Sequence, residues 1–317
     1  MQRTGLIGLL LVVTIAVYSE KQSRIQIVTY NVENLFYPLC DTVGDDKNPD
    51  REFTPEGKYR WSFTRYRQKL HNIAKVLTCI NGDSLPAIVG LCEVEDKRCA
   101  EDLVRMMPHS RYKFIHYDSP DARGIDVVLL YDSVLFRPIV HKQAAVGIQT
   151  RDILYTKGVL CECDTLHLLL CHYPSQRGGA RKSGWKREKV HNIVTAYTDS
   201  IFRTDVRAKI VVMGDFNSAP RWNLPHLVNL ASQERFKGTG TYKYQGIWTC
   251  LDQFYVSECI QEAVEAEIYR PSWLMEEDRR YMDVKPMRTY LGYRYRKGGF
   301  SDHLPFVLTY SYPACAE

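Results

Sequence analysis

The stretch Val211-Val212-Met213-Gly214-Asp215-Phe216-Asn217 joins a short apolar run to a carboxylate and a carboxamide. Three successive apolar residues are typical of a buried strand, and Gly214 permits a tight turn at its end. Asp215 and Asn217 are then presented where the strand stops. Taken alone, Gly-Asp-x-Asn fits an ordinary turn as well as a site, because Asp and Asn are common turn residues. The rest of the chain decides between these two interpretations.

Similar arrangements accompany the other predicted strands. Arg24 to Tyr30 is rich in β-branched and aromatic residues, while Ala87 to Cys92 and Leu166 to Cys171 are continuous apolar runs. Acidic, amide or imidazole groups follow or enter these and the remaining strands: Asn31, Glu93, Asp126, His172, Asp215, Asn217, Asp252, Asp302 and His303. A random scatter of polar residues would not favour strand ends so consistently. We therefore expect these side chains to converge on one site.

Two of the carboxylates lie inside apolar runs. Asp126 enters Gly124 to Tyr131, and Asp252 lies within Gly246 to Val256, which we expect to be a single strand. An unpaired buried carboxylate is strongly destabilising or becomes neutral, so each of these groups needs a partner.

Apolar residues at helical spacing predict a helix from about Thr64 to Ile80 and shorter helices near Cys99 to Met107 and Trp222 to Ala231. A further helix is expected after Lys189. Residues 38 to 60 are crowded with Pro, Gly, Asp and Asn, which predicts a long surface loop. No repeat, low-complexity segment or linker divides the chain.

The N-terminus resembles an export signal. Arg3 precedes an apolar segment from Leu6 to Val17, and Val17 and Ser19 have side chains small enough for cleavage before Glu20. We expect residues 1–19 to be a signal peptide, residues 20–317 to form a single domain, and the protein to be periplasmic or secreted. A membrane-spanning helix needs roughly 20 apolar residues. No transmembrane domain is predicted beyond this segment, although an uncleaved N-terminal anchor is an alternative.

The chain has a mild basic excess, which fits an anionic substrate without requiring one. Loss of Arg3 with the signal peptide changes the formal net charge from +5 to +4. Basic residues concentrate in Arg177 to Lys189 and in Arg294 to Lys297. Either segment is consistent with phosphate binding or with an ordinary solvated loop.

The ten cysteines do not predict a metal site. Cys79, Cys92 and Cys171 lie in apolar runs, where cysteine commonly serves as a small buried side chain. Cys161 and Cys163 lack a second Cys/His pair at zinc-finger spacing. Disulfides are compatible with export, but the sequence does not identify the pairs.

The polar groups suit a hard divalent ion and proton transfer. Carboxylate and amide oxygens are ligands that Mg²⁺ or Mn²⁺ accepts, together with waters and substrate phosphate oxygens. Histidines paired with carboxylates can move protons near neutral pH. The combination favours attack of water on a phosphate ester.

These residues resemble a known superfamily. Tyr30-Asn31-Val32-Glu33-Asn34-Leu35-Phe36, Glu93, His172-Tyr173-Pro174-Ser175, Gly214-Asp215-Phe216-Asn217 and Ser301-Asp302-His303 look like the motifs of the endonuclease/exonuclease/phosphatase superfamily. The resemblance spans roughly residues 24 to 310. It implies an α/β fold, a four-layer sandwich in which two mostly antiparallel sheets pack face to face, with helices outside and the site at one edge.

The resemblance also implies roles for individual residues. Glu93 would be the main metal ligand, with Asn31 and Asp302 near the ion. His303, oriented by Asp252, would be the base for the attacking water.

Further roles concern the phosphate. Asp215 and Asn217 would position water and the scissile group, and His172 would contact or protonate a phosphate oxygen. Asp126 is the candidate acid that orients His172. Arg177, which together with the following glycines resembles a group of bacterial secreted or envelope members, and Arg181 would bind substrate.

The leading hypothesis is an exported endonuclease that uses Mg²⁺, with Mn²⁺ as an alternative, and needs no stable protein partner. A phosphomonoesterase or a lipid phosphodiesterase, such as a sphingomyelinase, could use the same site. Tyr290, Tyr293 and Tyr295 suit base stacking and a lipid interface equally well. A catalytically silent binding module is the third hypothesis, and the complete set of acids, amides and histidines argues against it.

Overall fold

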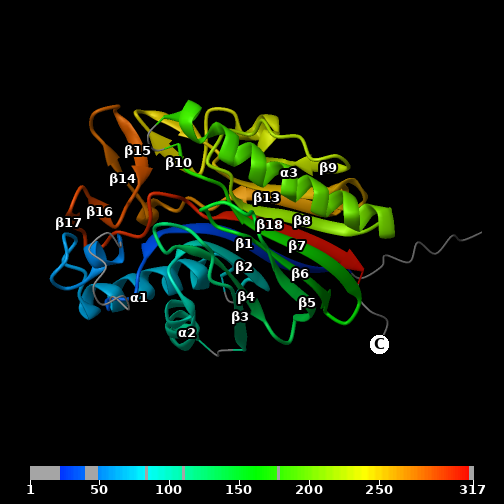
Figure 1. Cartoon of the computed structure of the whole chain (residues 1–317), viewed down its shortest axis with the longest axis horizontal. Helices are drawn as coiled ribbons and strands as arrows, with labels where there is room; N and C mark the ends of the chain where they lie inside the picture. The colour runs from blue at the N-terminus through cyan, green and yellow to red at the C-terminus, as the bar shows by residue number, and fades with distance from the viewer. Residues whose placement is uncertain (1–21, 40–48, 83–84, 109–110, 177–178, 314–317) are drawn as a thin grey trace, which may run out of the picture.

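A computed structural model describes residues 22–39, 49–82, 85–108, 111–176 and 179–313. Within these residues the chain forms two six-stranded sheets that pack face to face, with α-helices on their outer faces (Figure 1). The expected four-layer α/β sandwich is thereby confirmed. The proposed signal peptide lies outside the described residues.

Each sheet is mixed but mostly antiparallel. The first has the order β13(Val264–Ile268)-β18(Phe306–Pro313)-β1(Gln22–Leu35)-β2(Ile88–Val94)-β4(Asp126–Asp132)-β3(Tyr112–His116). The second has the order β5(Phe136–Ala144)-β6(Ile153–Leu160)-β7(Asp164–His172)-β8(Lys209–Asp215)-β12(Asp252–Ser257)-β9(Leu227–Asn229). The parallel pair in each sheet, β1 with β2 and β7 with β8, places the C-terminal ends of those strands side by side.

Three hydrophobic clusters separate the four layers. One joins the first sheet to α1 (Phe63–Cys79) and α2 (Lys97–Met106), one lies between the sheets, and one joins the second sheet to α3 (Ala180–Thr204). Among the described residues, no helix is long and apolar enough to cross a membrane.

Strand β8 shows how the sequence specifies this packing. Val211 and Met213 enter the core between the sheets, whereas Ile210 and Val212 face α3. Because successive side chains of a strand point to opposite faces, a strand buried on both faces must be apolar throughout. Gly214 lies within the strand, not in the tight turn expected from the sequence.

Two of the sequence-based element predictions are wrong. Trp222 to Ala231 is not an α-helix, because Leu227–Asn229 pairs with β12 as an edge strand and a 3₁₀ turn follows. Gly246 to Val256 is not one strand but two, β11 (Ile247–Thr249) and β12. β9 pairs with a strand later in the chain, whereas β11 leaves the sheet to pair with β10 (Tyr242–Tyr244) in a separate hairpin, and local composition reveals neither pairing.

Strands β1 and β2 are irregular where they deliver polar groups. The β1–β2 register shifts between Asn31 and Leu35, and the β2–β4 register shifts between Cys92 and Val94. Glu33, Asn34 and Glu93 have positive φ angles of 54°, 56° and 66°. Asn31 and Glu93 therefore lie within their strands, at bulges, instead of at the strand ends. Bulges of this kind redirect side chains near functional sites.

The cysteine predictions are partly confirmed. Cys92 and Cys171 are buried in the cores, but Cys79 is exposed near the end of α1. Cys163 is disulfide-bonded.

Candidate active site

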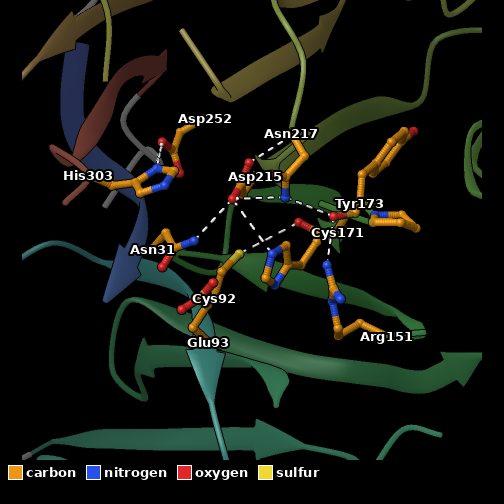
Figure 2. A network of polar contacts seen from close by, with 12 residues as sticks. Asn31, Cys92, Glu93, Arg151, Cys171, Tyr173, Asp215, Asn217, Asp252 and His303 are labelled. Atoms are coloured by element: carbon orange, nitrogen blue, oxygen red, sulfur yellow. Dashed lines mark hydrogen bonds and ion pairs between the residues drawn. The ribbon is translucent and has the colours of Figure 1, made fainter. Parts of the chain in front are cut away.

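Asn31 of the first sheet and Asn217, which follows β8 of the second, meet at the carboxylate of Asp215 (Figure 2). Asn31 Nδ2 donates to Asp215 Oδ2 at 3.0 Å, and Asn217 Nδ2 lies 3.2 Å from the same oxygen. The Asn217 backbone N–H donates to Asp215 Oδ1 at 2.8 Å, and its side chain donates to the carbonyl of Tyr173 at 2.9 Å. Asp215 is thus a buried acceptor that fixes both amides, and burial raises its pKa to about 6.

A second pair joins β12 to the loop before β18. His303 Nδ1 lies 2.7 Å from Asp252 Oδ2, and both residues are buried. Burial lowers the pKa of His303, but the neighbouring carboxylates, Asp252 foremost, outweigh it and raise the pKa to about 10. Ser301 Oγ accepts from the His303 backbone N–H and donates to the carbonyl of Asn31. This serine ties the His303 segment to β1.

His172 lies at the end of β7, with Nε2 3.6 Å from Asp215 Oδ2. Burial, followed by the positive charges of Arg151 and Arg123, holds the pKa of His172 well below its ordinary value. The imidazole is therefore neutral near pH 7. A neutral imidazole can donate one hydrogen bond to a phosphate oxygen, which favours a contact role over proton donation.

The structure corrects the expected pairing of Asp126 with His172. Asp126 Oδ2 lies 3.1 Å from His116 Nε2, and Ser119 donates to the other carboxylate oxygen. His172 Nδ1 has no hydrogen-bond partner within the described part of the chain. The short aspartate side chain is held by β3 and the loop that follows it, so Asp126 orients His116 instead.

Glu93 lies beside Asn31 in the close view (Figure 2). Its Oε2 accepts the backbone N–H of Asn34 at 2.9 Å and lies 3.7 Å from Arg123 Nη2. Arg123 also donates to the side-chain oxygen of Asn34 at 2.5 Å. A basic group that the sequence did not single out is therefore adjacent to the expected main metal ligand.

The sequence did not predict a partly buried charge network that includes Asp302. Arg288 donates to Asp302 Oδ2 at 2.9 Å and to Glu33 Oε1 at 3.2 Å, and the Thr289 backbone N–H donates to Glu33 Oε2. Burial and Asp302 raise the pKa of Glu33 to about 7, and burial lowers that of Lys69 to about 8. Lys69 Nζ donates to Thr289 Oγ1 and to the carbonyl of Phe300.

Two sequence signals could have identified part of this network. Glu33 follows Asn31 by two residues inside a buried strand, so it needs a partner for the same reason as Asp126 and Asp252. Lys69 follows Tyr66 by three residues and therefore lies on the apolar face of α1. Nothing local to Arg288 indicates its role.

The network leads to a prediction about metal affinity. Arg288→Gln should weaken Mg²⁺ binding by about 10- to 100-fold, because Asp302 loses the group that orients it. Titration calorimetry with Mg²⁺ measures this directly. Arg279→Gln, which removes an exposed arginine paired with Glu277, is the matched control. Equal Mg²⁺ affinity of Arg288→Gln and wild type would show that Arg288 does not position Asp302.

The basic and aromatic residues proposed for substrate binding lie in different environments. Arg177 lies outside the described residues, and Arg181 is the second residue of α3, with a side chain that is not described. Arg187 is buried and donates to the carbonyl of Pro174, so it stabilises the loop. Arg296 pairs with Glu276 at 2.5 Å, and Tyr290 is buried. These last three residues are structural.

The residues around Asn31 fit a divalent cation of the Mg²⁺ type. Glu93 and Asp302 offer carboxylates, Asn31 offers an amide oxygen, and Asp252 Oδ1 is a buried oxygen without a partner among the described residues. Two other groups in the described part of the chain bring ligand atoms of three acidic, histidine or cysteine residues within 4.8 Å of one another. They are Glu95-Asp96-Cys99 and His116-Asp118-Asp126, and neither includes Glu93 or Asp302. Mg²⁺ needs only one or two protein carboxylates and keeps several waters, so Glu93 and Asp302 with the Asn31 amide suffice.

Residues 26–311 match the Endonuclease/Exonuclease/phosphatase family. The chain belongs to this family. Its members include metal-dependent phosphodiesterases and nucleases. No curated protein matches the sequence significantly.

Solved structures of several other proteins share the fold. Truncated TDP2 from Caenorhabditis elegans is 17% identical with a TM-score of 0.58, and the match covers 90% of this chain and 97% of that one. D. rerio TDP2 complexed with a single-strand DNA product is 13% identical, with a TM-score of 0.55 and coverage of 90% and 98%. The human Nocturnin catalytic domain with bound sulfate is 13% identical, with a TM-score of 0.55 and coverage of 90% and 93%.

Proposed function

We propose that this protein is an exported, divalent-metal-dependent phosphodiester hydrolase whose substrate is a nucleic acid. The observation that carries the proposal is the buried His303–Asp252 pair, 2.7 Å apart. It belongs to the same site as the Asp215, Asn31 and Asn217 network. A histidine oriented by a carboxylate next to fixed amide donors suits activation of water against a phosphate ester.

The site residues have distinct tasks. Asp252 accepts the Nδ1 proton of His303, which leaves Nε2 to take a proton from water. Asn217 and Asn31 are each held by Asp215, so their amides are fixed before substrate binds. Fixed donors stabilise developing charge without reorganisation during the reaction.

Glu93, Asn31 and Asp302 would hold the cation. When bound, the cation supplies positive charge that polarises the phosphate and neutralises its oxygens. Positive charge beside Asp302 would also lower the pKa of His303 and so favour the neutral base.

Several observations support the choice of an exported nuclease. The chain has a formal net charge of +5, and a disulfide at Cys163 fits an oxidising compartment. The D. rerio TDP2 structure contains a single-strand DNA product. The apolar N-terminus is the basis of the proposed export.

A lipid phosphodiester is the second candidate substrate. Exposed apolar side chains, such as Tyr293, Leu291 and Met282, favour it. Nucleic acid recognition does not require exposed aliphatic groups.

Metal dependence and substrate class are tested together. Wild type should cleave one member of a panel of plasmid DNA, single-stranded DNA, RNA, sphingomyelin vesicles and inositol phosphates only with Mg²⁺ or Mn²⁺. Excess chelator should abolish turnover, and Glu93→Gln should lower kcat/KM by about 100-fold or more, or roughly 2.7 kcal/mol of transition-state stabilisation. Glu265→Gln, at an exposed position of β13, is the control.

Two results would refute the proposal. Hydrolysis that survives both the chelator and Glu93→Gln excludes the metal-dependent mechanism. Hydrolysis of sphingomyelin without cleavage of any nucleic acid would transfer the assignment to the lipid candidate.

A further inference from the structure

Within the described residues, three β-hairpins lie outside the two sheets: β10(Tyr242–Tyr244)–β11, β14(Met275–Asp278)–β15(Asp283–Pro286) and β16(Tyr290–Leu291)–β17(Arg294–Tyr295). Figure 1 shows them gathered at one end of the molecule. Each hairpin has a short turn at its tip. We call these three tips together the hairpin edge.

The hairpin edge presents apolar side chains to solvent. Between 38% and 94% of the surface of each of six large apolar residues is exposed there: Tyr244, Ile247, Tyr281, Met282, Leu291 and Tyr293. Each of the three tips contributes two of them. Isolated exposed apolar residues are ordinary, but a repeated pattern at neighbouring tips indicates an interaction surface.

The three hairpins are held together by polar contacts. Lys243 of β10 binds Asp283 of β15 at 2.5 Å, and Trp248 of β11 donates to the same carboxylate at 3.2 Å. Arg296, which follows β17, binds Glu276 of β14 at 2.5 Å. The tips therefore form a connected edge and not three independent loops.

Two of the hairpins are attached to the candidate site itself. Tyr242 forms a bridge with His303, and their rings are 4.9 Å apart. Arg288, two residues before β16, binds Asp302. The hairpin edge is therefore anchored to the candidate site through two of its three hairpins.

Basic side chains accompany the apolar ones. Arg280, Arg294 and Lys297 are exposed, and none of them forms an ion pair with an acidic group of the described residues. Arg279 is paired with Glu277, and Asp283 is already bound by Lys243. The unpaired charge at the edge is therefore positive.

We propose that the hairpin edge docks on an anionic lipid bilayer and holds the site at the membrane surface. Aromatic and aliphatic side chains enter the interfacial region, while arginine and lysine bind anionic headgroups. A nucleic acid strand accounts for the tyrosines and arginines through stacking and phosphate contacts. It does not account for Ile247, Met282 and Leu291, which lack an aromatic face.

This inference concerns binding, so it can be tested apart from the proposed hydrolysis. The full-length protein should sediment with vesicles of phosphatidylcholine and phosphatidylglycerol more strongly than with vesicles of phosphatidylcholine alone. The triple substitution Ile247→Asp, Met282→Asp and Leu291→Asp should weaken binding to the anionic vesicles by about tenfold or more. Arg280→Gln with Arg294→Gln should remove much of the salt-sensitive part of the binding.

Val206→Asp is the matched control, because Val206 is 82% exposed in the turn before β8, at the end of that strand opposite Asp215. It should bind the anionic vesicles as wild type does. Hydrogen exchange provides a local readout that the apolar N-terminus does not influence. Amides of residues 279–282 and 291–294 should become protected on anionic vesicles, while those of residues 205–207 should not.

Three outcomes would overturn the proposal. The first is equal sedimentation of wild type and the triple variant, and the second is unchanged exchange at the tips on vesicles. The third is protection of the tips by single-stranded DNA but not by vesicles, which would identify the edge as a nucleic acid surface. A triple variant that loses vesicle binding but still cleaves a soluble phosphodiester would support docking and leave the proposed hydrolysis intact.

Discussion

Replacing His303 by alanine is expected to lower kcat by at least about 100-fold while the fold remains intact. The reason is the loss of the group that takes the proton from water, since general-base catalysis typically contributes roughly 10²- to 10⁴-fold to the rate. The side chain is buried against Asp252, with only 6% of its surface exposed. Steady-state kinetics on the substrate found in the panel, together with circular dichroism, measure both parts of this expectation.

Two companion variants separate proton transfer from packing. Asp252→Asn retains the shape of the partner but removes the negative charge that fixes the His303 tautomer, so it should also lower kcat strongly. His167→Ala removes a buried histidine that contacts Tyr155 on the outer face of β7, away from the site, and should leave kcat near the wild-type value. A kcat of His303→Ala within a few-fold of wild type would exclude His303 as the base.

Gly214→Ala is expected to reduce stability by about 3 kcal/mol or more, because the methyl group has no space and the backbone is unsuited to it. A Cβ at this position would lie 1.8 Å from the carbonyl oxygen of Cys171, and φ is 135°. For a chain of this size, such a loss should lower Tm by roughly 5 to 10 °C. Asp215 follows directly, so activity should fall as well.

Gly184→Ala is the matched control for that experiment. Gly184 lies in α3, and a Cβ there would meet nothing within 4 Å. Alanine should be neutral or stabilise the helix by up to about 1 kcal/mol. Differential scanning calorimetry of the two variants makes the comparison. Equal Tm values for Gly214→Ala and wild type would contradict the close approach of β7 and β8.

The stretch from Val211 to Asn217 shows how far a sequence pattern can carry the argument. Its apolar run predicted a buried strand, and Ile210 to Met213 divide between two cores. The reason for the glycine was not predicted. Gly214 is required by the approach of the neighbouring strand β7, whose residues are some 40 positions earlier in the chain.

The carboxylate–histidine pairs were also predicted only in part. Asp252 was expected to orient His303, and the two lie 2.7 Å apart. Asp126 was expected to orient His172, but it binds His116, because the side chain is short and β3 is its immediate neighbour. Which acid meets which histidine depends on strand order and side-chain reach, and neither can be read from local pattern.

The sequence by itself determined the family, the α/β elements and the set of acids, amides and histidines, because apolar periodicity marks strands and the motifs lie beside them. Only the tertiary structure placed Asn31 and Glu93 at bulges and brought Arg288 to Asp302 and Glu33. It also gathered the three hairpins into one edge beside His303. Such contacts join residues up to 255 positions apart, and their geometry follows from the packing of whole sheets, not from the residues near each one in sequence.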